Sequence, residues 1–289
     1  DWSSDVCSSD LPATYPYGTT TVTWTVTDIH GNSTTTTQTV TVNDNERPTI
    51  GGLSDVTVNN DAGQCSSSNV NLGTPTTSDN CGVQSVSNDG SGTYSVGTTA
   101  VTWTVTDIHG NSSTYTQYVT VNDVENPTIS GLSAVTVNSD AGQCSASNVN
   151  LGTPTTSDNC GVQSVTNNAP SSFPVGTTTV TWTVTDIHGN STTTTQTVTV
   201  LGKISGKAFY DANGNGSDDD GKVLPGWTVK ITYASTTITL TTNGNGMYCA
   251  NLPIGTYTVS EVIPTETWTN TTPAIASVSI TSQACNPVV

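Results

Sequence analysis

The chain has 289 residues, and its 22 acidic and only five basic side chains give a formal charge of −17 at pH 7. So few cations cannot neutralise phosphates, and an anionic membrane surface would repel the chain, which disfavours nucleic-acid and membrane-surface binding. No apolar run approaches the roughly 20 residues that a membrane-spanning helix needs. The abundant Thr, Val, Gly and Asn favour strands and turns over helices.

The first eleven residues, DWSSDVCSSDL, read as the in-frame translation of a common sequencing-library adapter. We interpret residues 1–11 as an artefact and exclude them from fold reasoning. The alternative is a genuine flexible terminus. The exclusion removes Cys7 and three aspartates, which leaves six cysteines and a formal charge of −14. Six cysteines in a chain of this composition indicate an oxidising compartment.

The strongest signal is internal repetition with a period of 79 residues. The segment VTWTVTDIHGN recurs three times and places Trp24, Trp103 and Trp182 at equivalent positions. The period predicts a partial repeat at 12–43 and two whole repeats at 44–122 and 123–201.

Each repeat has the pattern of short strands. Apolar residues alternate with threonines over 22–27, which indicates a strand with one buried and one solvated face. Residues 28–32, DIHGN, supply turn chemistry, because Asp and Asn bond their own backbone and Gly permits positive φ. The alternation resumes at 39–42, which predicts a hairpin, and 55–58 predicts a further strand. Several such strands within about 80 residues indicate an immunoglobulin-like β-sandwich.

Two cysteines occur in each whole repeat, and we predict that they pair within it, as Cys65–Cys81 and Cys144–Cys160. A domain this small buries little surface, and closing a loop of about 15 residues contributes roughly 3 kcal/mol. Zinc is the alternative, but there is no Cys-x-x-Cys pair and each repeat offers only two thiols. Whether Cys249 pairs with Cys285 stays open.

The repeated sequence GQCSxSNV…TSDNCGV…VGTTxVTWTVTDIHGN resembles the hyalin repeat. The resemblance implies an immunoglobulin-like fold, and it implies that the chain belongs to an extracellular protein linked to adhesion. The matching residues of the first whole repeat are Cys65, Asp79, Asn80, Cys81, Gly97, Trp103, Asp107, Gly110 and Asn111.

The composition changes near Leu201, where lysines appear, so a different module is expected over 202–289. The segments GKISGKAFYDANGNGSDDDG and TTNGNGMYCANLPIGTYTVSEV resemble the prealbumin-like B-type domains of bacterial adhesins, which bind calcium. The resemblance covers about 203–264. The expected fold class is therefore all-β: tandem immunoglobulin-like sandwiches followed by a prealbumin-like sandwich.

The candidate metal site is a loop with oxygen donors at alternate positions: Asp211, Asn213, Asn215 and Asp219. Calcium is a hard cation that takes six to eight oxygen ligands, and Gly216 permits a sharp turn. Position 12 of an EF-hand loop is a bidentate Glu, but here it is Lys222, with Asp218 or Asp220 as substitutes. The alternative is an Asx-rich turn without an ion.

The three histidines, His30, His109 and His188, occupy one repeated turn, which favours a structural role over a catalytic one. The junctions at 43–48 and 122–127 weakly resemble the calcium linkers of cadherins, and a solvated acidic linker is the alternative. No hydrolase, metalloprotease or nucleotide-binding motif is present.

These features lead us to expect non-catalytic stalk or adhesion modules of a secreted or cell-surface bacterial protein. The partner would be an unidentified extracellular protein or glycan, with calcium as the cofactor, no nucleic acid and no membrane insertion. The alternative is that the modules are accessory parts of a larger secreted hydrolase whose catalytic domain lies elsewhere.

Overall fold

A computed structural model describes residues 14–263, 269–272 and 275–287. Every regular element in these residues is a β-strand, which confirms the all-β prediction. The chain forms two compact units, 1–123 and 124–289, and each is described by itself. The predicted artefact at 1–11 lies outside the described residues.

The partial repeat is a two-stranded antiparallel hairpin of β1 (Gly18–Thr27) and β2 (Ser33–Val42). The turn at 28–32 joins the strands as expected. Within the described residues no further strand pairs with this hairpin, so Trp24 stays 43% exposed, whereas the equivalent Trp103 is only 6% exposed. Half a repeat therefore forms the predicted hairpin but buries its tryptophan poorly.

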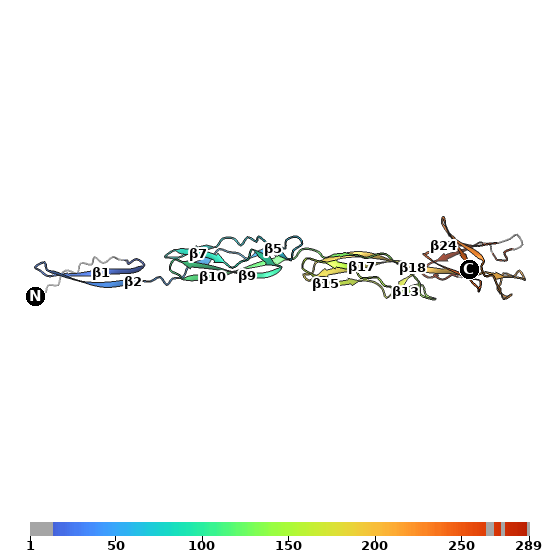
Figure 1. The fold of residues 1–289 in the computed structure, drawn as a ribbon, viewed down its shortest axis with the longest axis horizontal. Coiled ribbons are helices and arrows are strands. Elements are labelled where there is room, and N and C mark those ends of the chain that lie inside the picture. The colour runs from blue at the N-terminus through green and yellow to red at the C-terminus, as the bar shows by residue number, and fades with distance from the viewer. Residues whose placement is uncertain (1–13, 264–268, 273–274, 288–289) are drawn as a thin grey trace. The chain divides into compact units, whose positions relative to one another are not determined.

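The first whole repeat is a sandwich of one four-stranded sheet, in the order β4-β10-β9-β7, and two small sheets, β3-β6 and β5-β8. Strand β4 is parallel to β10, and the long strands β9 and β10 run antiparallel side by side (Figure 1). The strands are β3 (Thr49–Gly51), β4 (Val56–Asn59), β5 (Ser66–Ser68), β6 (Thr76–Ser78), β7 (Val83–Asn88), β8 (Thr93–Ser95), β9 (Gly97–Asp107) and β10 (Ser112–Asn122).

The core of this repeat follows the predicted period of two. In β9, Val101, Trp103 and Val105 are buried, and the threonines between them are more exposed. Tyr94 closes the core from β8, and Val119 contributes from β10. The alternation in the sequence therefore places the valines and the tryptophan on the face that the small sheets cover.

A buried glutamine fixes the tryptophan in this core. Nε1 of Trp103 donates a 3.0 Å hydrogen bond to Oε1 of Gln117, which is 1% exposed. The amide nitrogen of Gln117 donates to the backbone carbonyls of Ser54 and Leu72, at 2.6 and 3.0 Å. One side chain thus joins β10 to β9, to the loop between β3 and β4, and to the loop between β5 and β6.

The second whole repeat has the same topology, with the sheet order β12-β18-β17-β15 and the small sheets β11-β14 and β13-β16. Trp182 donates to Gln196 at 3.0 Å, so the buried clamp recurs. The strands are β11 (Thr128–Ser130), β12 (Val135–Asn138), β13 (Ser145–Ser147), β14 (Thr155–Ser157), β15 (Val162–Asn167), β16 (Ser172–Pro174), β17 (Gly176–Asp186) and β18 (Ser191–Lys207).

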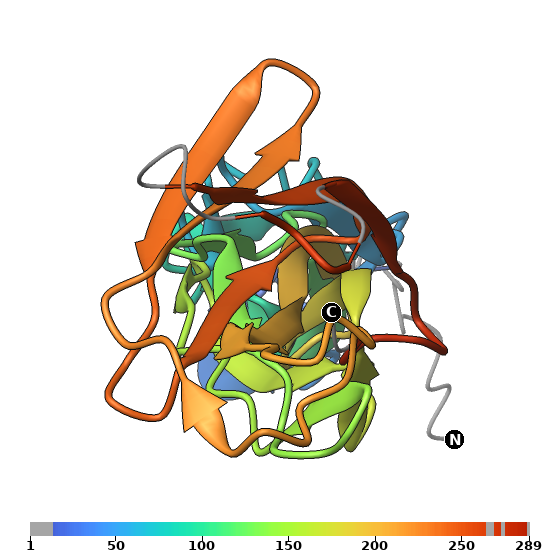
Figure 2. The ribbon, with the colours of Figure 1, turned by 90° about the vertical axis from the view of Figure 1, so that its right-hand side faces the viewer.

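The C-terminal module has a four-stranded sheet in the order β22-β21-β24-β25, which is orange to dark red in Figure 2. Strand β23 pairs instead with the end of β18, and β19 pairs with β20. The strands are β19 (Phe209–Tyr210), β20 (Lys222–Val223), β21 (Thr228–Tyr233), β22 (Thr236–Thr241), β23 (Met247–Leu252), β24 (Gly255–Val262) and β25 (Ile275–Ile280).

Strand β18 crosses the predicted boundary at 201/202 without interruption. Its first part pairs with β12 and β17 of the repeat, and Gly202–Lys207 pair with β23 of the C-terminal module. Val200 and Ile204 are both fully buried and belong to one hydrophobic cluster that contains residues of both modules. The second repeat and the C-terminal module therefore share a strand and a core.

Candidate metal centre

The predicted calcium loop connects the paired strands β19 and β20 and is organised around Asp211. Oδ1 of Asp211 accepts hydrogen bonds from the amides of Gly214 and Asn215, at 2.7 and 3.2 Å, and Oδ2 accepts one from Gly216 at 2.7 Å. Gly214 and Gly216 have φ angles of +72° and +77°, which glycine adopts without strain. The loop thus wraps its backbone amides around the first predicted ligand.

The other predicted ligands meet on the same loop. Nδ2 of Asn215 donates to Oδ2 of Asp219 at 2.7 Å, and Nδ2 of Asn213 lies 3.3 Å from Oδ1 of Asp219. Burial acts to raise the pKa of Asp211, but hydrogen bonds from Thr271 and from the loop amides together outweigh it and hold this pKa below its ordinary value. The four predicted oxygen donors therefore lie in one hydrogen-bonded loop whose first carboxylate is ionised.

Lys222 lies outside this loop. It begins β20 opposite Tyr210, and its ammonium lies 5.6 Å from the centroid of the Tyr210 ring. Asp220, one of the two suggested substitutes, accepts a hydrogen bond from the amide of Ala212 across the base of the loop. Asp218, the other, pairs with Lys207. Position 12 of the EF-hand pattern thus falls on a strand.

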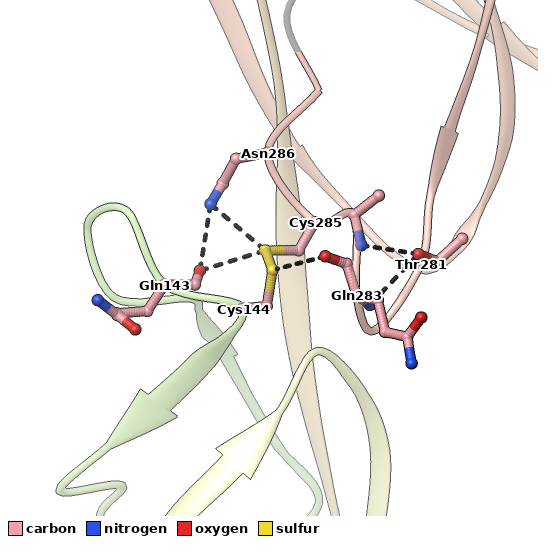
Figure 3. Close-up of a disulfide and its surroundings, with 7 residues drawn as sticks. Gln143, Cys144, Thr281, Gln283, Cys285 and Asn286 are labelled. Carbon is pink, nitrogen blue, oxygen red and sulfur yellow. Dashed lines mark hydrogen bonds between the residues drawn. A yellow bond between two sulfur atoms is a disulfide. The ribbon is translucent and has the colours of Figure 1, made fainter.

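The predicted disulfides within single repeats are wrong. Cys144 bonds Cys285, which is 141 residues further along the chain (Figure 3). Cys81 is a free thiol. Cys249, for which pairing with Cys285 was left open, is also free. Nδ2 of Asn286 donates to the carbonyl of Gln143 at 3.2 Å beside this bond. The bond therefore joins the second repeat to the C-terminal module.

The correction has a geometric reason. The carbonyl of Cys65 accepts from the amide of Val96, at the start of β9, whereas the carbonyl of Gly82, next to Cys81, accepts from Ile108, just after the end of β9. A strand of this length spans about 35 Å, but the Cα atoms of a disulfide lie within about 7 Å. Spacing along the sequence did not reveal that the two cysteines lie at opposite ends of the sandwich.

The remaining cysteines of the repeats differ between copies. Cys65 and Cys160 are each disulfide-bonded. Cys81, which is equivalent to Cys160, stays reduced, and burial, followed by a hydrogen bond to Asp44, raises the pKa of its thiol.

The DIHGN turn has the structure expected from the sequence. Asp107 is completely buried and accepts hydrogen bonds from the amides of His109 and Asn111, both at 2.8 Å, and from the side chain of Asn111 at 2.7 Å. The turns at Asp28 and Asp186 repeat this arrangement. Gly110 has a φ of +96°.

His109 has contacts that go beyond the turn. Its Nδ1 lies 2.9 Å from Oδ2 of Asp44, and its ring stacks on that of Tyr17 at 3.5 Å between centroids. This hydrogen bond is the main reason why the pKa of Asp44 lies below its ordinary value.

The buried glutamine clamp was not predicted from the sequence. A signal was available, because Trp24, Trp103 and Trp182 are each followed by a glutamine 14 residues later. The pairing of Cys144 with Cys285 was not predicted either, because Cys285 lies outside the repeats and no repeat spacing relates the two cysteines.

These features define a class of protein: tandem all-β sandwich modules with a buried Trp–Gln clamp in each whole repeat. Residues 122–200 match the HYR domain family, which confirms the predicted hyalin repeat in this part of the chain. The chain is 35% identical over 142 residues to hyalin of Strongylocentrotus purpuratus. That similarity covers 46% of this chain and 12% of the length of the sea-urchin protein.

One solved structure with a distant likeness is that of protocadherin gammaB7 domains EC3-6, which has 13% identity and a TM-score of 0.32. The match covers 94% of this chain and 85% of the protocadherin chain. The TIE protein of Bacillus anthracis has 12% identity and a TM-score of 0.38, and the match covers 84% of this chain and 57% of the TIE chain. The described residues include no apolar helix long enough to cross a membrane.

Proposed function

We propose that this chain is a non-catalytic, load-bearing spacer of an extracellular bacterial adhesion protein, secreted or held at the cell surface. The hyalin-repeat match and the disulfide chemistry support an extracellular setting. The observation that carries the proposal is the continuous strand β18, which is hydrogen-bonded on both sides of the junction between two modules. A joint of this kind transmits force without a flexible linker. The partner is an extracellular protein or glycan.

Single-molecule stretching tests the load-bearing role. In a chain with Cys65→Ser and Cys160→Ser, only the Cys144–Cys285 bond remains of the disulfides described. A residue adds about 3.6 Å when extended, so the 141-residue separation should withhold about 500 Å of extension until the bond is reduced.

The matched control replaces Cys144 and Cys285 by serine as well, and should extend fully without reductant. Equal extension of both chains under oxidising conditions would show that the junction carries no covalent tether.

We further propose that the loop of Asp211, Asn213, Asn215 and Asp219 binds calcium. Support comes from the convergence of these side chains on one exposed loop and from the tight turns at Gly214 and Gly216. The amide groups of both asparagines now point their nitrogens at Asp219, so binding requires them to rotate and present oxygen. Magnesium should substitute poorly, because it demands a tighter octahedral shell.

Calorimetric melting of the full chain tests this loop. When calcium exceeds its Kd a hundredfold, the gain in stability should be about 2.7 kcal/mol. Asp211→Ala should remove most of the part of this gain that comes from the loop, because it deletes the carboxylate around which the loop is wrapped. Lys230→Ala, on a strand away from the loop, should keep it. A calcium-induced shift of the same size in the Asp211→Ala chain would place the ion elsewhere.

A further inference from the structure

Side chains that can ligate a metal also meet at one end of the first whole repeat. Asp44 follows the hairpin, Asp79 follows β6, and Asp107 ends β9. One carboxylate oxygen from each lies within 4.8 Å of the other two. His109 and Cys81 also lie beside Asp44 at this end. Three segments far apart in the sequence thus bring three negative charges together.

Two of these three carboxylates are shielded from water. Asp107 is fully buried, and the side chain of Asp44 is 2% exposed. Arg47 is the only Lys or Arg before Lys203 in the sequence. Like charges at this separation, shielded from water, repel one another, and a cation between them would offset this repulsion.

The decisive observation concerns Asp79. Its Oδ2 accepts hydrogen bonds from the amides of Cys81 and Gly82, at 2.8 and 3.0 Å. Its Oδ1 is shielded from solvent and has no hydrogen-bond partner, and the same holds for Oδ1 of Asp158, its equivalent in the second repeat. A buried carboxylate oxygen without a partner is costly, and it recurs in both copies.

We propose that Asp44, Asp79 and Asp107 form a calcium site at this end of the hyalin repeat. Two oxygens that share a calcium ion at about 2.4 Å lie at most about 4.8 Å apart, and the three carboxylate oxygens lie within this limit of one another. Oδ1 of Asp79 gains its missing partner, and the three charges are neutralised.

The donor set distinguishes calcium from zinc. A zinc site here would use the sulfur of Cys81 with His109 and Asp44. The equivalent of Cys81 in the second repeat, Cys160, is disulfide-bonded and has no thiolate to offer. The aspartates are retained at all three positions, as Asp123, Asp158 and Asp186. The oxygen set is therefore the part that both repeats share.

The test is independent of the C-terminal loop. The full chain with Asp211→Ala and Asp219→Ala is titrated with calcium chloride by calorimetry and melted with calcium or with chelator. This parent should still bind calcium. Adding Asp79→Asn and Asp158→Asn should weaken the remaining binding at least tenfold, because an amide brings no charge.

Asp89→Asn is the matched control, because the second repeat has an asparagine, Asn168, at the equivalent position. Asp89 accepts a 2.7 Å hydrogen bond from the amide of Thr102, and Asn168 accepts one of the same length from the amide of Thr181. It removes one charge from the same repeat and should leave binding within twofold of the parent.

The melting temperatures give a second readout. In chelator, the Asp79→Asn, Asp158→Asn chain should melt no lower than its parent, because the repulsion is relieved. In calcium it should melt lower than its parent. A purely structural role for these aspartates would lower the melting temperature equally in both conditions and would overturn the proposal. The proposal would also be overturned if the chain with Asp211→Ala and Asp219→Ala bound no calcium at millimolar concentration. The same would follow if that chain bound zinc and lost it with Cys81→Ser.

Discussion

Replacing Cys144 and Cys285 together by serine should lower the free energy of unfolding of residues 124–289 by about 5 kcal/mol. The bond closes a loop with a sequence separation of 141, and in the entropic model the stabilisation grows with the length of the closed loop. For a unit of this size the melting temperature should fall by roughly 10 °C. Calorimetry of the oxidised chains measures both quantities.

Cys249→Ser is the matched control, because Cys249 is an exposed free thiol on β23 in the same unit. Its effect should stay within about 0.5 kcal/mol. In a background with Cys65→Ser and Cys160→Ser, reduction of the chain that keeps Cys144 and Cys285 should reproduce the loss, whereas reduction of the chain that also lacks them should cause no further loss. A double variant as stable as the oxidised parent would mean that the shared strand and core alone hold the two modules together.

The second large effect is expected at the buried glutamine. Gln117→Ala should destabilise the first whole repeat by about 3–5 kcal/mol. It leaves Nε1 of Trp103 and the carbonyls of Ser54 and Leu72 without their partner and opens a cavity in the core. Gln117→Met fills the volume but not the hydrogen bonds, and about 2 kcal/mol of the loss should remain.

The chain contains its own control for this substitution. Gln38 makes the same 3.0 Å hydrogen bond with Trp24 in the hairpin, but there the pair is exposed to solvent. Gln38→Ala should cost less than about 0.5 kcal/mol, because water replaces the lost partner. Denaturant unfolding, followed by tryptophan fluorescence, compares the three variants. Equal losses for Gln117→Ala and Gln38→Ala would show that burial does not control the strength of this clamp.

The sequence by itself determined the strands, the turns and the repeat. Alternation of valine and threonine placed Val101, Trp103 and Val105 in the core, because side chains of a strand alternate between its two faces. The DIHGN turns formed as expected, because an aspartate two residues before an amide bonds it locally, whatever surrounds the turn. The oxygen donors of the loop at 211–219 lie within nine residues, so local chain geometry brings them together.

Only the tertiary structure decided how distant residues meet. Cys65 and Cys81 are 16 residues apart in the sequence, but they lie at opposite ends of β9, so pairing by proximity along the chain failed. Cys144 and Cys285, like Asp44, Asp79 and Asp107, are brought together by the packing of separate strands. The sequence records which side chains exist, but the neighbours of a side chain at the end of a strand depend on which strands pack beside it.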